Sequence, residues 1–296
     1  MKARPTSFVG FLSRLGVKLE PGQLAFWAVA VDGVDPCDLS GEARELARGE
    51  IFSCERISPE ARAAAVVATV KGAGVGFSYA GGLYMLYAAL TGDHDGAPGE
   101  VRPALVCAPD MRLMRQVVRF ALGAAQSERS IRSRLENVTA DGFTLRREDG
   151  RLSGVEGKPA TAGGRATRGA RWVAALLDEA AFFKDADSGI VNDADIFGSV
   201  GPRNRGITLI GSTPWSESGL LWSFYTQNYG KPTNAIAAKL RTEVARTDPK
   251  VLAYVQRERE RDPENCAREH DCEFLPRGSA AFFDPEAVDA CIVGAA

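Results

Sequence analysis

The residues that suggest chemistry begin with the octapeptide KGAGVGFS at residues 71–78. Its glycines are typical of a loop whose backbone amides wrap phosphate groups, and its final hydroxyl suits Mg²⁺. The usual pattern, GxxxxGK[ST], carries lysine before that hydroxyl, whereas this sequence has Phe77 there and Lys71 at the first position. A lysine on a flexible stem at the opening end of the loop can reach the same phosphates. Taken alone, the stretch also fits a tight glycine turn with a solvated lysine.

A pair of acids follows the apolar run WVAALL, at Asp178 and Glu179. At the tip of a buried strand, one carboxylate suits Mg²⁺ and the other suits polarising an attacking water. The alternative is an ordinary helix start, since acids also favour the first turn of a helix.

Hydroxyls end a further apolar run in GITLIGSTPW, where Ser212 and Thr213 precede Pro214. The proline stops the strand and keeps the hydroxyls at its tip, where they can bind a phosphate or the catalytic acid. Taken alone, the stretch is better explained as a strand-terminating turn.

The surrounding pattern predicts the elements that position these groups. Apolar runs predict strands at 63–70, 104–107, 172–180 and 206–214, with a hairpin near 143–160. Apolar residues at helical spacing follow the glycine loop and Asp110. Further helices are predicted within 8–31, over 40–52 from Ser40, and in the tail from 238 onward. Strands that alternate with helices indicate an α/β fold with a mainly parallel, doubly wound sheet. The three polar strand ends are then expected at one edge.

The bulk composition sets limits on function. The 296 residues include 36 basic and 38 acidic ones, so any contact with nucleic acid requires a local patch. We interpret the six dispersed cysteines as thiols; Cys266, His270 and Cys272 lack a fourth ligand at zinc spacing. No signal peptide and no membrane span is expected.

These motifs together resemble the large subunit of the tailed-phage terminase, the ATPase that drives double-stranded DNA into proheads. The resemblance rests on PGQ at 21–23, KGAGVGFS at 71–78, CAPD at 107–110, ATRG ahead of LLDEA, and GSTPW at 211–215, in family order. Some terminases carry the same displaced lysine. The resemblance implies a P-loop NTPase fold of the ASCE, RecA-like type with a helical N-terminal lead-in.

The resemblance also implies roles for particular residues, with ATP and Mg²⁺ as ligands. The implied nucleotide-binding residues are Gln23, which reads adenine, and Lys71, Gly72, Ala73, Gly74, Val75, Gly76, Phe77 and Ser78. Ser78 and Asp178 hold Mg²⁺, Glu179 is the catalytic base, and Ser212 with Thr213 is the coupling motif. Arg168 is the arginine that acts on a neighbouring subunit, with Arg165 and Arg171 as rivals.

Two departures qualify the resemblance. Gly74 stands where many family members have arginine, and the family's nuclease domain has no room after AFFDPEAVDACI at 281–292. Nuclease activity is therefore not expected. We divide the chain into a helical lead-in at 1–60, a P-loop ATPase core at 61–240 and a helical tail at 241–296.

The expected partners are double-stranded DNA, the small terminase subunit, the portal protein and further copies of the chain in a ring, in the host cytoplasm. Arg112, Arg115 and Arg119 share one face of a predicted helix and are candidates to follow DNA phosphates. The alternatives are a nucleotide-binding packaging module that does not hydrolyse ATP and a helicase-like translocase. A translocase is expected to need a second motor domain, whereas about 80 residues follow GSTPW.

Overall fold

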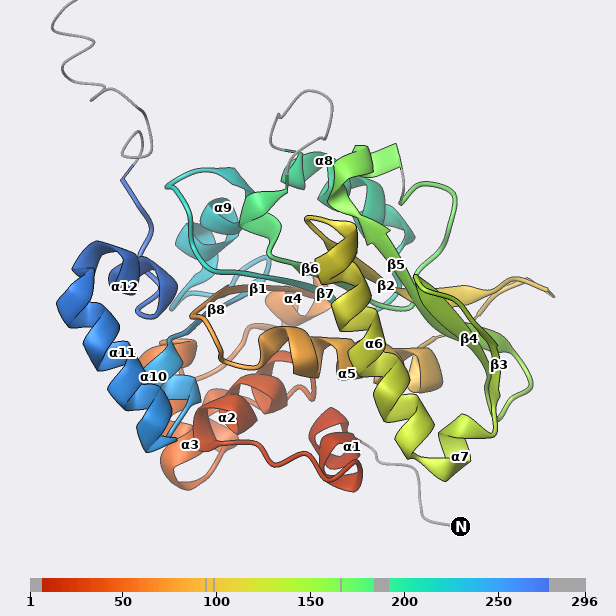
Figure 1. Ribbon diagram of the computed structural model, residues 1–296, viewed down its shortest axis with the longest axis horizontal. Coiled ribbons are helices and arrows are strands. Elements are labelled where there is room, and N and C mark those ends of the chain that lie inside the picture. Colours follow the sequence, from red (N-terminus) through yellow and green to blue (C-terminus); the bar gives the residue numbers. More distant parts are fainter. Residues whose placement is uncertain (1–6, 94, 98, 166, 184–191, 277–296) are drawn as a thin grey trace, which may run out of the picture.

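The computed structural model describes residues 7–93, 95–97, 99–165, 167–183 and 192–276, and in them it contains an eight-stranded sheet with helices on both faces (Figure 1). The strands are β1 (Val66–Lys71), β2 (Arg102–Ala108), β3 (Leu135–Val138), β4 (Gly142–Arg146), β5 (Leu152–Pro159), β6 (Ala175–Asp178), β7 (Thr208–Ser212) and β8 (Ile236–Leu240). The helices are α1 (Phe8–Arg14), α2 (Pro21–Ala30), α3 (Gly41–Leu46), α4 (Pro59–Ala63), α5 (Phe77–Thr91), α6 (Met111–Ser127), α7 (Arg129–Arg132), α8 (Asp193–Val200), α9 (Gly219–Asn228), α10 (Thr242–Ala245), α11 (Pro249–Arg261) and α12 (Pro263–Glu269).

The sheet order is β3-β4-β5-β2-β6-β7-β1-β8. In this order, the six neighbouring strands β5, β2, β6, β7, β1 and β8 are parallel to one another, while β3 and β4 add an antiparallel edge. This arrangement confirms the expected mainly parallel α/β sheet and the hairpin near 143–160. Because β1, β6 and β7 are adjacent and parallel, their polar ends lie at one edge of the sheet, as the sequence predicted.

Burial explains why the central strands read as continuous apolar runs. All six residues of β1 are buried, since helices cover both faces of a parallel sheet. Val67 belongs to an apolar cluster that includes residues of α5 and α6, whereas Ala68 and Val70 belong to a second cluster that includes residues of α8 and α9. These two pairs of helices lie on opposite faces of the sheet (Figure 1). The sheet edge that carries the polar residues is thereby fixed between two apolar layers.

The expected helix starts are largely confirmed. The Asp110 carboxylate caps α6 by accepting from the backbone amide of Leu113 at 2.9 Å, and α3 begins directly after Ser40. None of the helices in the described ranges is long and apolar enough to cross a membrane.

The expectation of a helical tail from 238 onward is wrong at its start. Residues 236–240 form β8, which pairs in parallel with β1 over a register that ends at Lys71 and Leu240. The segment is only five residues long and contains two alanines, so its strand character depends on the neighbouring β1 rather than on its own pattern. The stretch at 281–292 and Cys291 lie outside the described residues.

Candidate functional site

The phosphate-type loop presents unpaired backbone amides. Within the described residues, the five consecutive amides from Gly74 to Ser78 donate to no protein acceptor. The positive φ values of Gly74 (+72°) and Gly76 (+81°) turn the chain so that the loop enters the first turn of α5, whose amides are free by construction. Consecutive free amides at a helix start form a concave site for an anion such as phosphate.

Phe77, at the usual lysine position, belongs to the core. Its side chain is 2% exposed and stacks on the Trp27 ring with 5.9 Å between centroids. Gly211 of β7 leaves room for it, because a Cβ there would lie 2.2 Å from the Phe77 ring. This position therefore serves packing, and a cation for the site has to come from elsewhere.

Lys71, the last residue of β1, supplies that cation. Its side chain is buried, and its Nζ lies 2.5 Å from Glu179 Oε1. Burial opposes the charge, but the carboxylates of Glu179 and Asp178 outweigh burial and raise the pKa of Lys71. Lys71 is thus a charged ammonium held at the carboxyl edge of the sheet.

Glu179 is held from three sides. Its second oxygen, Oε2, accepts from the Ser212 hydroxyl at 3.0 Å and from the Thr213 amide at 3.3 Å. The residue itself adopts a left-handed backbone conformation, with φ 56° and ψ 44°, which costs free energy in a non-glycine residue. The structure therefore brings together Lys71, Glu179 and the Ser212-Thr213 pair, which the sequence placed at three separate strand ends.

Asp178 is buried at the end of β6, level with Gly211 of β7. Burial raises the pKa of Asp178 to about 6, although the Lys71 ammonium and a hydrogen bond from Ser78 oppose the rise. Its Oδ1 has no hydrogen-bond partner among the described residues. An orphaned carboxylate oxygen beside a serine hydroxyl fits Mg²⁺, which takes one or two protein oxygens and completes its shell with water and phosphate.

Other groupings of metal-ligating side chains are not found in the part of the chain that the structure describes. The Cys266, His270 and Cys272 trio is engaged otherwise, since Cys266 and Cys272 are buried thiols and His270 Nδ1 lies 3.0 Å from Thr242 Oγ1.

Gln23 connects the N-terminal helices to the phosphate-type loop. Its Nε2 donates to the Val75 carbonyl at 2.9 Å, and its Oε1 accepts from the Glu20 amide at 3.1 Å as part of a capping box at the start of α2. The amide thus contacts the loop, and one Nε2 hydrogen remains.

The arginine candidates lie outside this cluster. Arg165 and Arg168 are exposed between β5 and β6, and Arg171 is 3.9 Å from Glu100. On α6, Arg112 and Arg119 are exposed, whereas Arg115 donates to Asp141 at 2.7 Å. The predicted stripe of three is therefore reduced to two arginines without an ion pair in the described ranges.

Segments distant in sequence, which no motif predicted, support the start of the loop through hydrogen bonds. The Gly72 amide donates to the Leu240 carbonyl, the Ala73 amide donates to the Glu269 carbonyl, and the Ala73 carbonyl accepts from Thr242. These partners lie about 170 to 200 residues from the loop. Because the contacts are mostly backbone hydrogen bonds, no sequence motif indicates them.

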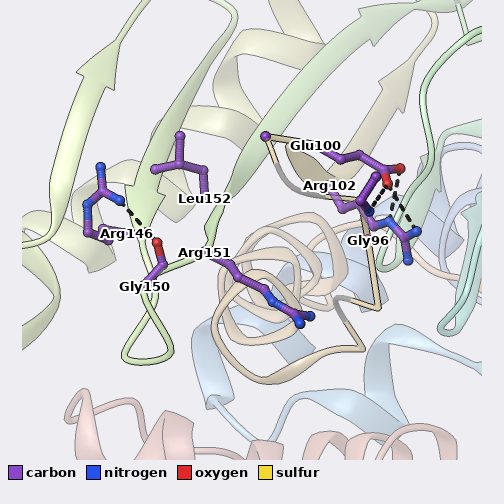
Figure 2. A pocket seen from close by; sticks show the side chains of 9 residues that line it. Gly96, Glu100, Arg102, Arg146, Gly150, Arg151 and Leu152 are labelled. Atoms are coloured by element: carbon purple, nitrogen blue, oxygen red, sulfur yellow. Dashed lines mark hydrogen bonds and ion pairs between the residues drawn. The ribbon is translucent and has the colours of Figure 1, made fainter.

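A separate cavity of about 430 Å³ lies at the opposite edge of the sheet, beside the start of β2 and β5 (Figure 2). Arg102, which is 2% exposed, forms a two-pronged ion pair with Glu100 there, and Arg146 donates to the Gly150 carbonyl. The lining residues that the structure describes include no glycine-rich helix start and no acid pair.

Comparison with known proteins agrees with the fold. The sequence matches no protein-family model and none of the curated proteins. Solved structures with the same fold include the Thermus phage P74-26 large terminase ATPase domain, at 17% identity and a TM-score of 0.51, covering 82% of this chain and 100% of that one. The large terminase of another thermophilic bacteriophage, in complex with ADP, has 12% identity and a TM-score of 0.52, covering 74% and 50%.

The HK97 bacteriophage large terminase has 15% identity and a TM-score of 0.52, covering 70% of this chain and 46% of that one. At these identities the likeness establishes the fold. The chain thus shares its fold with these large terminase structures, and the resemblance inferred from its motifs is confirmed at the level of the fold.

Proposed function

We propose that this chain is the ATP-hydrolysing motor domain of a viral terminase large subunit, which drives double-stranded DNA into proheads. The observation that carries the proposal is the run of five amides from Gly74 to Ser78 that have no acceptor in the described chain, placed beside Lys71, Asp178 and Glu179 at one sheet edge. The shared fold with terminase ATPase domains supports the same assignment.

The phosphates of ATP fit the free amides and the Lys71 ammonium. Lys71 then exchanges Glu179 for phosphate oxygens, which are equally good partners for a buried cation. The relocated lysine replaces the one that Phe77 displaces, because Lys71 Nζ lies 5.9 Å from the centroid of the Phe77 ring and so close to the usual lysine position.

Ser78 and Asp178 would hold Mg²⁺, because they offer a hydroxyl and an orphaned carboxylate oxygen. When bound, Mg²⁺ neutralises charge on the phosphate oxygens. Cation binding favours ionised Asp178 and so opposes the effect of burial on its pKa.

Glu179 acts as the base that orients the attacking water. Once Lys71 turns to phosphate, Oε1 is free to accept a proton, while Ser212 and Thr213 keep Oε2 in place. These two residues lie at the end of β7, so a shift of that strand end moves the base, which is the basis for assigning them to coupling.

The remaining assignments concern the adenine and the partners. Gln23 uses its remaining Nε2 hydrogen toward adenine, and exposed Arg168 acts on the cleft of the next subunit in a ring. Arg112 and Arg119 contact DNA phosphates, and the small terminase subunit and portal complete the assembly in the host cytoplasm.

The test is steady-state ATP hydrolysis with Mg²⁺, with and without double-stranded DNA, over a range of protein concentrations. Glu179→Gln is expected to lower kcat by about 10³-fold or more while the chain still folds cooperatively in thermal unfolding. Glu264→Gln, an exposed position on α12, is the matched control and is expected to behave as wild type. Equal turnover by Glu179→Gln and wild type contradicts the proposal.

A second candidate is a packaging module that binds nucleotide without hydrolysing it. It is favoured by one observation: both oxygens of Glu179 are occupied, by Lys71 and by the Ser212-Thr213 pair. Binding of ATP without phosphate release at any protein concentration supports this second reading. Multiple turnovers that depend on Glu179 exclude it.

A further inference from the structure

A buried hydroxyl, which no sequence motif indicates, is hydrogen-bonded to the backbone of the phosphate-type loop. Thr242, the first residue of α10, is 1% exposed, and its Oγ1 donates to the Ala73 carbonyl at 2.9 Å. The same oxygen lies 3.0 Å from Nδ1 of His270, which is 8% exposed. One oxygen thus joins the loop to the residue that follows α12.

The number of protons available decides which group donates. A hydroxyl has a single proton, and a backbone carbonyl can only accept. Since Thr242 donates to Ala73, the Nδ1 of His270 must itself carry a hydrogen and donate to Thr242. The contact therefore requires His270 to be protonated on Nδ1.

Backbone hydrogen bonds surround this pair. The Gly72 amide donates to Leu240 at 2.9 Å, the Ala73 amide to Glu269 at 2.6 Å, and the Thr242 amide to His270 at 3.0 Å. A Cβ on Gly72 would lie 2.5 Å from Thr242 Oγ1, so glycine is required for this approach. The Leu240 and Glu269 carbonyls thus pair with the first two loop amides, while the next five amides have no acceptor in the described chain.

We propose that Thr242, oriented by the Nδ1 hydrogen of His270, is a positioning residue that holds the loop in its phosphate-binding shape. This inference rests on the proposed function. The hydroxyl contacts the loop backbone, so it acts on nucleotide affinity by ordering the amides before the ligand arrives. Segments at both ends of the α10–α12 region then determine how well the site binds phosphate.

The first experiment measures the affinity for ATPγS with Mg²⁺ by calorimetry, together with KM and kcat for ATP. Thr242→Val keeps the shape and removes the hydroxyl, leaving the Ala73 carbonyl and the His270 N–H unpaired; about tenfold weaker binding is expected. Thr242→Ser restores the hydroxyl and is expected to bind within about twofold of wild type. The loss should appear in KM rather than in kcat, because the catalytic carboxylate is untouched.

A second experiment examines the histidine without any nucleotide. The chain has two histidines, so a long-range ¹H–¹⁵N spectrum with a His94→Gln variant assigns the ring of His270. The Nδ1-protonated form is expected at neutral pH, and Thr242→Val should change that signature. His270→Asn, which keeps an N–H donor close to the Nδ1 position, should retain affinity, whereas His270→Leu should match Thr242→Val.

Outcomes separate this inference from the proposed function. If wild type binds ATPγS and Lys71→Ala does not, while Thr242→Val binds like wild type, the positioning role is wrong and the function stands. A ring that carries a hydrogen on Nε2 and none on Nδ1 overturns the proton assignment. If wild type binds no nucleotide, both proposals fail. Thermal unfolding of each variant shows whether lost affinity comes from the loop or from lost folding.

Discussion

Two buried cations lie at opposite edges of the same sheet, and their surroundings differ. Arg102, at the start of β2, donates to both oxygens of Glu100 (Figure 2). The Glu100 carboxylate also accepts from the Ala97 amide. These hydrogen bonds lower the pKa of Glu100. Lys71, at the end of β1, meets Glu179, but the neighbouring Asp178 keeps an oxygen without any partner in the described chain, and burial raises the pKa of Asp178 to about 6.

Complete pairing distinguishes a buried charge with a structural role from one that a ligand is expected to complete. A charge that is matched locally and completely has no reason to exchange partners, so its role is to hold a loop in place. A carboxylate left buried and incomplete costs stability and persists where a ligand completes it. The carboxyl edge of the sheet is of the second kind, and the amino edge is of the first.

The strongest test of this comparison replaces each cation by methionine. Lys71→Met should lower ATP turnover by at least about 10²-fold, because the buried cation that we propose binds the phosphates is removed. Arg102→Met should leave turnover within about twofold of wild type and lower the unfolding temperature by roughly 3–6 °C, because Glu100 loses its partner. Phosphate release and thermal unfolding measure the two effects. Loss of turnover in Arg102→Met at full folding would break the comparison.

A second test uses the pH dependence of stability. The pKa of Asp178 is about 6 in the folded chain against an ordinary value of 3.8, so the folded state binds the extra proton. The free energy of unfolding should therefore fall as pH rises from about 4 to about 6, by up to about 3 kcal/mol from this group. Asp178→Asn should lack this fall, so its free energy of unfolding should increase relative to that of the wild type between pH 4.5 and pH 7.5.

Urea unfolding of both proteins in EDTA measures that gain. Carboxylates distant from Asp178 contribute equally in both proteins, so their contributions cancel in the difference. A constant difference between Asp178→Asn and wild type at the two pH values would mean that Asp178 is not the incomplete group described above.

The smallest expected effect lies on α6, where the same distinction separates neighbouring arginines. Arg115 is matched by Asp141, whereas Arg112 and Arg119 are exposed without an ion pair in the described ranges. Arg112→Gln and Arg119→Gln should each reduce the salt slope of double-stranded DNA binding by about 1, with Arg115→Gln as the matched control that leaves it unchanged. Binding titrations from low to moderate salt measure the slopes. If all three variants have the same salt slope as the wild type, α6 does not contact DNA.

Much of this edge could be predicted from local sequence. The apolar run into Lys71 followed by glycines predicted β1, the loop and α5, and the abrupt change from Leu177 to Asp178 predicted the end of β6. Such signals depend on neighbours within one strand or turn, so they need no knowledge of the sheet order. The strand β8 was missed because its identity depends on pairing with β1.

Local sequence is enough to predict the α/β class, the order of the polar strand ends and the types of residue available at them, because each follows from periodicity and turn chemistry within short windows. Tertiary packing was needed to show that Phe77 fills the core beside Gly211, that Lys71 contacts Glu179, and that Thr242 supports the loop. Those contacts join residues up to about 170 positions apart, and their geometry is set by the register of a parallel sheet packed between two layers of helices.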